Sequence, residues 1–384
     1  MSLLPLAAQM DEDALEDKLE AARADLADEY GQNHKYPWII GFSGGKDSTL
    51  VLQLAMEMLL ELPPSERKRM VHVVSNDTLV EAPVVADLVD RTLDRISDAV
   101  TAMRLPIVVA KTAPKVDQTF WVNLIGRGYP APSRTFRWCT DRMKIQPTSR
   151  YIRSRVSENG EVILLLGVRR QESATRAVSM SRYDNGERLN DHNDLKGCKV
   201  FRPIVDFSTD EVWTTLLQRR PPWGGSHRDL VALYKDGQGG ECPLVLSKDD
   251  APSCGTSSSR FGCWTCTVVV KDRSMAGFIE AGHENLEPLM DFRDWLAEIR
   301  NDPARRSARR RNGQTTFLAD GSLVPGPFTP TARREILDRL HQVERATGRT
   351  LITAAEIEAI NRIWAEDAAA VVASVEATAL EAVS

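Results

Sequence analysis

The chain has 384 residues, of which 42% are hydrophobic and 27% charged, with a formal net charge of −5 and a sequence pI near 5.8. This balance suits a globular protein of one large domain with additions, or of two to three domains, and it excludes a generally basic nucleic-acid binder but not a local basic groove. No apolar run is long enough to span a bilayer, and residues 1–10 lack the basic region of a signal peptide, so we expect a cytoplasmic protein with no membrane partner. Six cysteines in such a chain favour metal or sulfur chemistry over disulfides.

The first predicted element is an amphipathic helix over 11–30, with leucines at helical spacing between acidic residues. A short apolar run, Trp38 to Phe42, then predicts a buried strand. Apolar spacing from Leu50 onward predicts a helix directly after a glycine turn. Such a strand, tight turn and helix aims backbone N–H groups at one point, where the helix dipole also favours an anion.

The turn between them reads Ser43-Gly44-Gly45-Lys46-Asp47-Ser48. Its glycines allow close approach of a phosphate, Lys46 adds a cation, and Asp47 can hold a magnesium ion. It is not a Walker A loop, because Ile40 stands where that motif needs its first glycine. The turn resembles the Ser-Gly-Gly-x-Asp-Ser loop of the ATP pyrophosphatase family, which holds the pyrophosphate of ATP. The alternative is an ordinary strand-to-helix turn with chance glycines.

A second buried strand is predicted over 71–77, a helix over 83–103 and a third strand over 106–110. Strands that alternate with helices predict a parallel, doubly wound sheet. Asn76 and Asp77 end the second strand, where a ligand would sit in such a sheet, so they are candidates for nucleotide contact; they could equally cap the next helix.

The stretch 133–147 is polar and reads as an active-site loop that enters a helix. It contains Cys139 among three cations, which would stabilise a thiolate; a buried structural cysteine is the alternative. These cations are Arg137, Arg142 and Lys144. The Trp-Cys-Thr pattern with Lys144 resembles the region after the third strand in sulfate-activating and phosphoadenylylsulfate-reducing relatives.

A further central strand is predicted over 162–168, and arginines follow it at once. Arg169, Arg170 and Arg176 at a strand's carboxyl end suit phosphate recognition, and the Gly-x-Arg-x-x-Glu-Ser-x-x-Arg pattern resembles the same family's substrate-side loop. Structural salt bridging is the competing interpretation. A capping box at Ser208 and Glu211 then predicts the start of a helix near the end of the nucleotide domain.

The character of the chain changes over 224–267, which is rich in glycine and serine and holds four cysteines at the spacing Cys-x11-Cys-x8-Cys-x2-Cys. Four thiolates in such a loop can hold zinc or an iron–sulfur cluster, and zinc sites usually show two close ligand pairs where this chain has one. The expected ligands are Cys242, Cys254, Cys263 and Cys266.

From residue 273 onward the chain is predicted to be largely helical, with a loop over 313–330 and a capping box at Thr353 and Glu356 before the last helix. A dense run of arginines lies between Arg300 and Arg311. In an acidic chain this run is the best candidate for a polyanion contact; a solvated loop paired with nearby acids is the alternative.

The phosphate loop, the Cys139 region and the four downstream cysteines together resemble the DndC/SspD-type ATP pyrophosphatases of bacterial DNA phosphorothioation systems, which belong to the phosphoadenylylsulfate reductase-like PP-loop superfamily. The resemblance spans about 37–275. It implies ATP cleavage to AMP and pyrophosphate, adenylation of a DNA backbone phosphate, and support for sulfur insertion. Its implied cofactors are ATP, Mg²⁺ and a [4Fe–4S] cluster. Its implied partners are DNA, a cysteine desulfurase as sulfur donor, and other proteins of the phosphorothioation system.

The expected fold is therefore α/β, a Rossmann-like doubly wound parallel sheet with a cysteine-rich cluster-binding subdomain and a helical C-terminal region. We expect an N-terminal helix in 1–35, the PP-loop domain in 36–210, the iron–sulfur subdomain in 211–275 and the helical region in 276–384. Expected catalytic residues are Lys46, Asp47, Cys139 and Arg170, with Arg169, Asn76, Asp77 and the loop residues 43–48 binding the nucleotide. Alternatives are a cluster-dependent tRNA thiolation enzyme, a phosphoadenylylsulfate reductase-like enzyme, and a non-enzymatic zinc-binding nucleic-acid module. The roles of Cys139 and Cys198 and the oligomeric state stay open.

Overall fold

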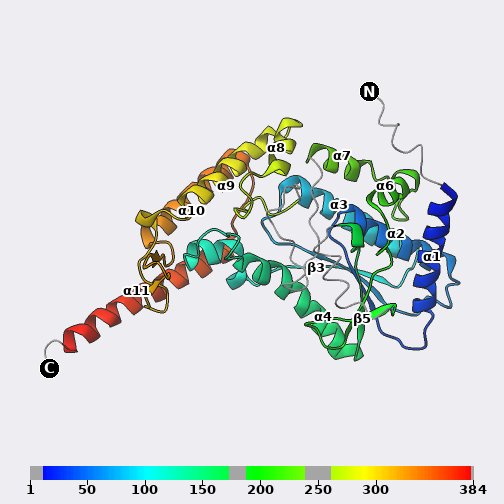
Figure 1. Cartoon of the computed structure of the whole chain (residues 1–384), viewed down its shortest axis with the longest axis horizontal. Coiled ribbons are helices and arrows are strands. Elements are labelled where there is room, and N and C mark those ends of the chain that lie inside the picture. Colours follow the sequence, from blue (N-terminus) through cyan, green and yellow to red (C-terminus); the bar gives the residue numbers. More distant parts are fainter. Residues whose placement is uncertain (1–11, 173–186, 238–260, 382–384) are drawn as a thin grey trace.

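A six-stranded sheet lies at the centre of the computed structural model, which describes residues 12–172, 187–237 and 261–381 (Figure 1). Its strand order is β3-β2-β1-β4-β6-β5, and every pairing is parallel except the one between β5 and β6. The predicted doubly wound sheet is confirmed, and two strands that the sequence did not predict extend it: β6, which is parallel to β4, and the antiparallel edge strand β5. The strands are β1 (Trp38–Gly41), β2 (Val71–Asn76), β3 (Ile107–Thr112), β4 (Val162–Leu165), β5 (Leu189–Asp191) and β6 (Cys198–Phe201).

Helices cover both faces of the sheet because successive strand residues point to opposite sides. Ile40 packs into the large hydrophobic cluster with α1 (Glu12–Tyr30), α2 (Lys46–Glu61) and α3 (Pro83–Ala102), whereas its neighbour Ile39 packs with α4 (Gln146–Asn159) on the other face. Both strand residues are fully buried. Continuous apolar runs such as Trp38 to Phe42 are therefore typical of strands covered on both sides.

The predicted helix starts are confirmed where they rest on capping. Ser208 accepts a hydrogen bond from the Glu211 backbone N–H at 3.1 Å and donates its own backbone N–H to the Glu211 carboxylate at 2.6 Å, ahead of α6 (Thr209–Gln218). Thr353 makes the same reciprocal pair with Glu356 at the start of α11 (Ala354–Glu381). After α6 comes α7 (Arg228–Asp236), which packs against α3.

The C-terminal helices lie to one side of the sheet, and α11 extends away from the body (Figure 1). They are α8 (Arg273–Glu280), α9 (Glu287–Ile299), α10 (Pro330–Thr347) and α11. Two indole N–H groups join them to the π-helix Val122–Gly126 and its flank: Trp121 donates to the Leu351 carbonyl at 2.6 Å and Trp364 to the Ile125 carbonyl at 3.0 Å.

Short elements complete the chain. The predicted loop over 313–330 contains a small hairpin, β7 (Thr316–Phe317) with β8 (Leu323–Val324), and a second π-helix spans Thr140–Ile145. Single 3₁₀ turns occur at Val116–Gln118, Arg170–Glu172, Glu284–Leu286 and Pro303–Arg305. In the part of the chain that the structure describes, every helix is too short or too polar to cross a bilayer.

Candidate functional site

The loop from Ser43 to Ser48 joins β1 to α2 and is shaped by its own small side chains. Gly44 adopts φ +75°, and a Cβ there would lie 2.5 Å from Cγ2 of Val89, so glycine is needed for both conformation and space. The Ser48 hydroxyl lies 3.3 Å from the Ser43 backbone N and donates to the Gly45 carbonyl at 3.0 Å. The loop thus closes on itself and presents the first amides of α2 at the carboxyl edge of the sheet, where an anion is favoured.

Three buried charges meet at this loop. The Asp47 carboxylate accepts from Lys46 Nζ at 2.9 Å and from Arg169 Nε at 2.5 Å. Lys46, Asp47 and Arg169 are 2%, 6% and 1% exposed. Arg169 also donates to the Phe207 carbonyl and the Thr209 hydroxyl, which fix its guanidinium. Two cations and one anion leave a net charge of +1, so the site favours an anionic ligand such as a phosphate.

Gly167, between β4 and Arg169, lets the chain that carries Arg169 lie close to the chain that carries Lys46 and Asp47. A Cβ at Gly167 would lie 2.7 Å from the backbone carbon of Asp47 and 2.8 Å from the backbone nitrogen of Ser48. Only glycine therefore lets the chain after β4 pass close to the start of α2. The sequence pattern contained this glycine but could not show which backbone it approaches.

Tyr234 on α7 is a site residue that sequence reasoning missed. Its hydroxyl accepts a hydrogen bond from the Lys46 backbone N–H at 3.2 Å, and Lys46 Nζ lies 5.8 Å from the ring centroid. The two residues are 188 positions apart in the chain. No local pattern could connect them, because the contact arises from the packing of α7 beside α3.

The side chains of Asn76 and Asp77 make hydrogen bonds within the protein. Asn76 donates to the Met143 carbonyl at 3.0 Å and accepts from the Thr112 hydroxyl at 3.0 Å. Asp77 accepts from the Leu79 backbone N–H at 2.8 Å, and its other oxygen lies 3.1 Å from Lys111 Nζ. These bonds tie the ends of β2 and β3 together. The N-cap residue of α3 is Ala82, without a side-chain cap bond, so the alternative that Asn76 or Asp77 caps this helix is wrong; nucleotide contact stays a prediction.

Cys139 lies at the start of the π-helix Thr140–Ile145, which Asn76 joins to the end of β2 through the Met143 carbonyl. The Cys139 side chain is partly exposed. Arg142, one of the cations expected beside it, contacts the Gln118 side chain and the Tyr129 hydroxyl. π-Helical turns often occur at functional sites, so the segment remains a candidate while the role of Cys139 stays a prediction.

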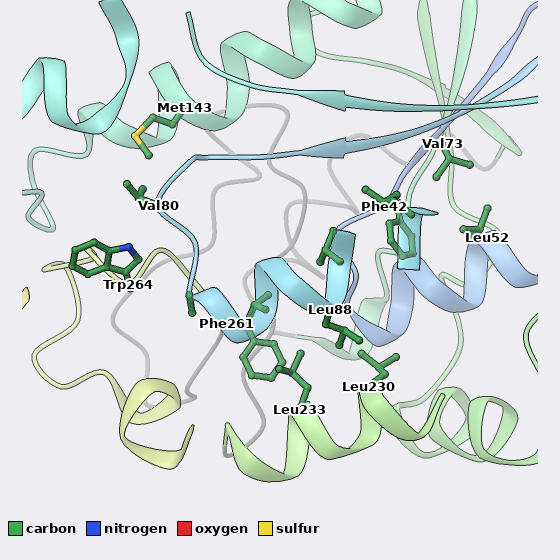
Figure 2. Packing of buried hydrophobic residues seen from close by; sticks show 14 of the residues in the cluster. Phe42, Leu52, Val73, Val80, Leu88, Met143, Leu230, Leu233, Phe261 and Trp264 are labelled. Atoms are coloured by element: carbon green, nitrogen blue, oxygen red, sulfur yellow. The ribbon is translucent and has the colours of Figure 1, made fainter. Parts of the chain in front are cut away.

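The segment that carries Cys263 and Cys266 is attached to the same edge of the sheet. Trp264 donates its backbone N–H to the Val80 carbonyl at 3.0 Å, and Glu81 forms an antiparallel bridge with Cys263. Figure 2 shows Trp264 beside Val80, while Phe261 lies against α7 next to Leu233. Val80 follows β2, and β1 and β2 are parallel, so the cysteine pair and the phosphate loop lie along one edge.

Polar groups surround Cys263. Its sulfur lies 3.4 Å from the Thr78 hydroxyl, which in turn donates to the Glu81 carboxylate at 3.5 Å. Burial raises the pKa of the Glu81 carboxyl to about 7; Lys144 opposes this increase and Asp77 adds to it. The Cys263 sulfur therefore lies beside the Thr78 hydroxyl, which links it to one carboxyl, Glu81, with a pKa near neutral.

Two arginines position the chain after the cysteine pair. Arg293, which is 1% exposed, donates to the carbonyls of Cys266 at 2.8 Å and Val270 at 3.0 Å, and also to that of Val269. Arg300 donates to the Thr267 carbonyl at 2.9 Å. These bonds connect α9 and its end to the described chain that directly follows Cys263, from Cys266 to Val270.

The described residues test the expected metal site only in part, because Cys242 and Cys254 lie outside them. Cys263 and Cys266 share a tight turn, in which the Cys266 backbone N–H donates to the Cys263 carbonyl at 3.0 Å. Over 12–172, 187–237 and 261–381, no group of three or more metal-ligating side chains comes together. The two described cysteines, close in sequence and partly exposed, fit one half of a four-thiolate site.

Arg170 and Cys198 lie away from the loop. Arg170 pairs with Asp206 at the surface, where the two side chains are 47% and 60% exposed, so its expected catalytic role stays a prediction. Ser173 and Arg176 are outside the described residues. Cys198 is buried in β6, and burial raises the pKa of its thiol to about 12, which makes it an unreactive core residue.

Most arginines of the run after α9 bond to groups within the protein. Arg305 pairs with Asp302 and with Glu335, the latter at 2.9 Å; Arg306 donates to the Gly326 carbonyl at 2.6 Å, and burial lowers its pKa to about 10. Arg311 pairs with Asp367 at 2.7 Å. Arg309 and Arg310 are exposed and have no side-chain partner among the described residues.

A cavity of about 30 Å³ lies behind the loop, between α2, α3 and α7. His227 lines it and donates Nε2–H to the Gln53 side-chain oxygen at 2.7 Å. Burial lowers the pKa of His227 to about 4, so the ring is neutral at physiological pH. A cavity of this size has room for ordered water but not for a nucleotide, and we assign it a packing role.

Comparisons with known proteins fit this architecture. Residues 37–269 match the model of the phosphoadenosine phosphosulfate reductase domain. The chain is 26% identical over 189 residues to the uncharacterized protein MJ0066 of Methanocaldococcus jannaschii and 27% identical over 201 residues to MJ0973 of the same organism. The matches cover 49% and 52% of this chain but only 33% and 41% of those relatives, so the chain spans well under half of their lengths.

Two solved structures match the chain at low TM-scores. The phosphoadenylyl-sulfate reductase from Candida auris, in a phosphate complex, has 12% identity and a TM-score of 0.34 over 55% of this chain and 87% of that one. The U34-tRNA thiolase NcsA from Methanococcus maripaludis, with its [4Fe-4S] cluster, has 13% identity and a TM-score of 0.36 over 76% of this chain and 79% of that one.

Proposed function

The chain belongs to the phosphoadenosine phosphosulfate reductase domain family, and we propose that within it this chain is an ATP pyrophosphatase that prepares a DNA backbone phosphate for sulfur insertion. One observation carries the proposal. The amide-lined loop with its Lys46, Asp47 and Arg169 triad lies on the same edge of the sheet as the Cys263 and Cys266 segment. A nucleotide phosphate site and a pair of thiols at one edge suit a reaction that activates an acceptor and then adds sulfur.

The proposed first step transfers AMP to a non-bridging oxygen of a DNA phosphate. The bond between the α- and β-phosphates of ATP breaks, pyrophosphate leaves, and a phosphoanhydride forms between AMP and the DNA. Lys46 and the α2 amides would hold the departing pyrophosphate and offset its charge. Arg169 acts through Asp47, which it orients. Magnesium would arrive with ATP, and Asp47 would supply a carboxylate oxygen to it.

The second step replaces AMP by sulfur. A sulfur nucleophile at the sulfide oxidation level attacks the activated phosphorus, and AMP departs with the original oxygen. We propose a cysteine desulfurase partner as the source, with a thiol reductant to release the sulfur as sulfide. The four cysteines would hold a [4Fe–4S] cluster, which can carry or position sulfur when bound. Anaerobically purified protein should then contain about four irons per chain; stoichiometric zinc without iron would contradict the cluster.

The reaction is tested by its products. Purified protein with ATP and magnesium should release AMP and pyrophosphate, whereas ADP and inorganic phosphate would refute the proposal. The acceptor is tested by mass spectrometry of host DNA and tRNA, with and without the gene. Loss of phosphorothioate dinucleotides supports DNA as the acceptor. Loss of a thiolated tRNA nucleoside instead would assign the same ATP chemistry to a base.

The DNA contact is proposed for the two exposed arginines, Arg309 and Arg310. An acidic protein must bind a polyanion through a local patch, and each phosphate contact lowers the slope of log K against log salt by about 0.9. Replacing both with alanine should weaken DNA binding and reduce the salt slope by up to about 1.8. The matched control replaces Arg91 and Arg153, which are exposed on α3 and α4, and removes the same net charge. An unchanged slope in the first variant would leave the DNA contact to a partner protein.

A further inference from the structure

The hydroxyl of Tyr234 stands at an amide that a bound phosphate would use. Lys46 is the first residue of α2, and its backbone N–H is one of the donors that has no partner within the helix. That N–H donates to the Tyr234 hydroxyl at 3.2 Å. Helix N-terminal amides bind phosphate oxygens in the same way, through an oxygen acceptor at hydrogen-bond distance.

The loop is shaped to accept an oxygen at this point. A Cβ on Gly45 would lie 3.3 Å from the Tyr234 hydroxyl and 3.4 Å from the Ser43 hydroxyl, so the missing side chain makes room for the approaching oxygen. The Lys46 ammonium lies 5.8 Å from the tyrosine ring, which keeps the cation close to the same position. The tyrosine oxygen thus occupies the place that an anionic oxygen would take.

The ring of Tyr234 connects this position to the cysteine segment. Trp213 and Phe261 pack edge-on against it, with ring centroids at 4.8 Å and 4.9 Å. Phe261 lies just before Cys263 and stacks on Phe278 of α8. A movement of the tyrosine ring would therefore displace Phe261 and, through it, the chain that carries the cysteine pair.

We infer that the Tyr234 hydroxyl is an internal substitute for a phosphate oxygen, which a polyphosphate displaces when it binds the loop, and that this displacement is transmitted through Phe261 to the Cys263 segment. The inference rests on the proposed nucleotide site. It makes Tyr234 a positioning residue that competes with the ligand for the Lys46 N–H and couples ligand binding at the loop to the cysteine segment.

The test uses the full chain and inorganic pyrophosphate as the probe. Y234F removes the competing oxygen but keeps the ring against Trp213 and Phe261. Calorimetric titration should show pyrophosphate affinity raised by about two- to tenfold, the value of one net hydrogen bond. The matched control is Y30F, which removes a hydroxyl that bonds the Arg69 carbonyl and N–H at 2.8 Å and 3.0 Å, neither of which belongs to the loop. Its pyrophosphate affinity should equal that of the wild type.

Hydrogen exchange over 261–270 gives a second readout. Pyrophosphate should change exchange in the wild-type segment and have a smaller effect in Y234F. If the wild type binds pyrophosphate but Y234F binds it equally or more weakly, the substitute-ligand inference is overturned while the nucleotide site stands. Unchanged exchange in the wild type on binding overturns the transmission to the cysteine segment. If neither protein binds pyrophosphate or ATP, the proposed function falls together with this inference.

Discussion

Asp47 holds two buried cations, so its replacement by asparagine should destabilise the empty protein and favour an anionic ligand. Asp47→Asn keeps the shape of the side chain but removes the carboxylate shared by Lys46 and Arg169, which are 2% and 1% exposed. Removing one partner of a buried ion pair costs about 3–5 kcal/mol, because the remaining charge loses its compensation. The two pairs share one carboxylate, so we use this range once rather than twice.

The assay is thermal unfolding with and without pyrophosphate. At about 2 °C per kcal/mol for a chain of this size, the ligand-free variant should melt roughly 6–10 °C below the wild type. The local charge changes from +1 to +2, so pyrophosphate should raise the melting temperature of the variant more than that of the wild type. ATP turnover should nevertheless fall, since the carboxylate proposed for the magnesium of ATP is lost.

Asp206→Asn is the matched control, because it removes the same group from an exposed pair with Arg170. Surface ion pairs contribute about 0–1 kcal/mol, so this control should melt within about 2 °C of the wild type. The reasoning is refuted if Asp47→Asn melts as close to the wild type as this control does. It is also refuted if pyrophosphate stabilises Asp47→Asn less than it stabilises the wild type.

Three further predictions test other parts of the site. Burial lowers the pKa of His227 from 6.5 to about 4, so its contribution to stability is complete above pH 6.5 and is lost as the pH falls toward 4. His227→Gln should therefore remove up to about 3 kcal/mol from the pH dependence of the free energy of unfolding. If the free energy of unfolding of the variant falls as steeply with pH as that of the wild type, the assignment is contradicted. Gly167→Ala should push the chain against Asp47 and weaken pyrophosphate binding at least tenfold. Gly160→Ala, at a position with open space but a φ of +83°, should lower stability through backbone strain yet leave pyrophosphate affinity unchanged. The Cys198 thiol should react with a disulfide reagent at pH 8 more slowly than Cys263 in the folded protein, as peptide mapping would show.

Local chemistry made much of the fold predictable. The apolar run at Trp38 to Phe42 became a strand buried on both faces, and the serine and glutamate pair at 208 and 211 became a capping box. Both depend on residues within a few positions of one another, where propensity and spacing act directly. The β5 strand was missed because three residues at a sheet edge carry too little periodicity to stand out from a polar stretch.

The site was less predictable because its contacts join distant segments. Lys46 and Tyr234 are 188 residues apart, and Asp47 and Arg169 are 122 apart. The sequence indicated cations after β4, but the environment of each was set by how the chain after Gly167 passes the start of α2. Asn76 shows the reverse case, since its position at a strand end suggested a ligand while its amide bonds the Met143 carbonyl and the Thr112 hydroxyl.

Arg169 and Arg170 show why the number of arginines is a poor guide to function in this chain. They are neighbours in sequence, yet Arg169 is buried against Asp47 and Arg170 pairs with Asp206 at the surface. The surface pair between Arg170 and Asp206 changes the free energy of unfolding little. Burying Arg169 with Lys46 and Asp47 is different, because a buried ion group is often no more stable than an apolar replacement of the same volume. Stability alone therefore does not explain why this triad is buried, whereas the proposed binding of a polyphosphate beside its two cations does.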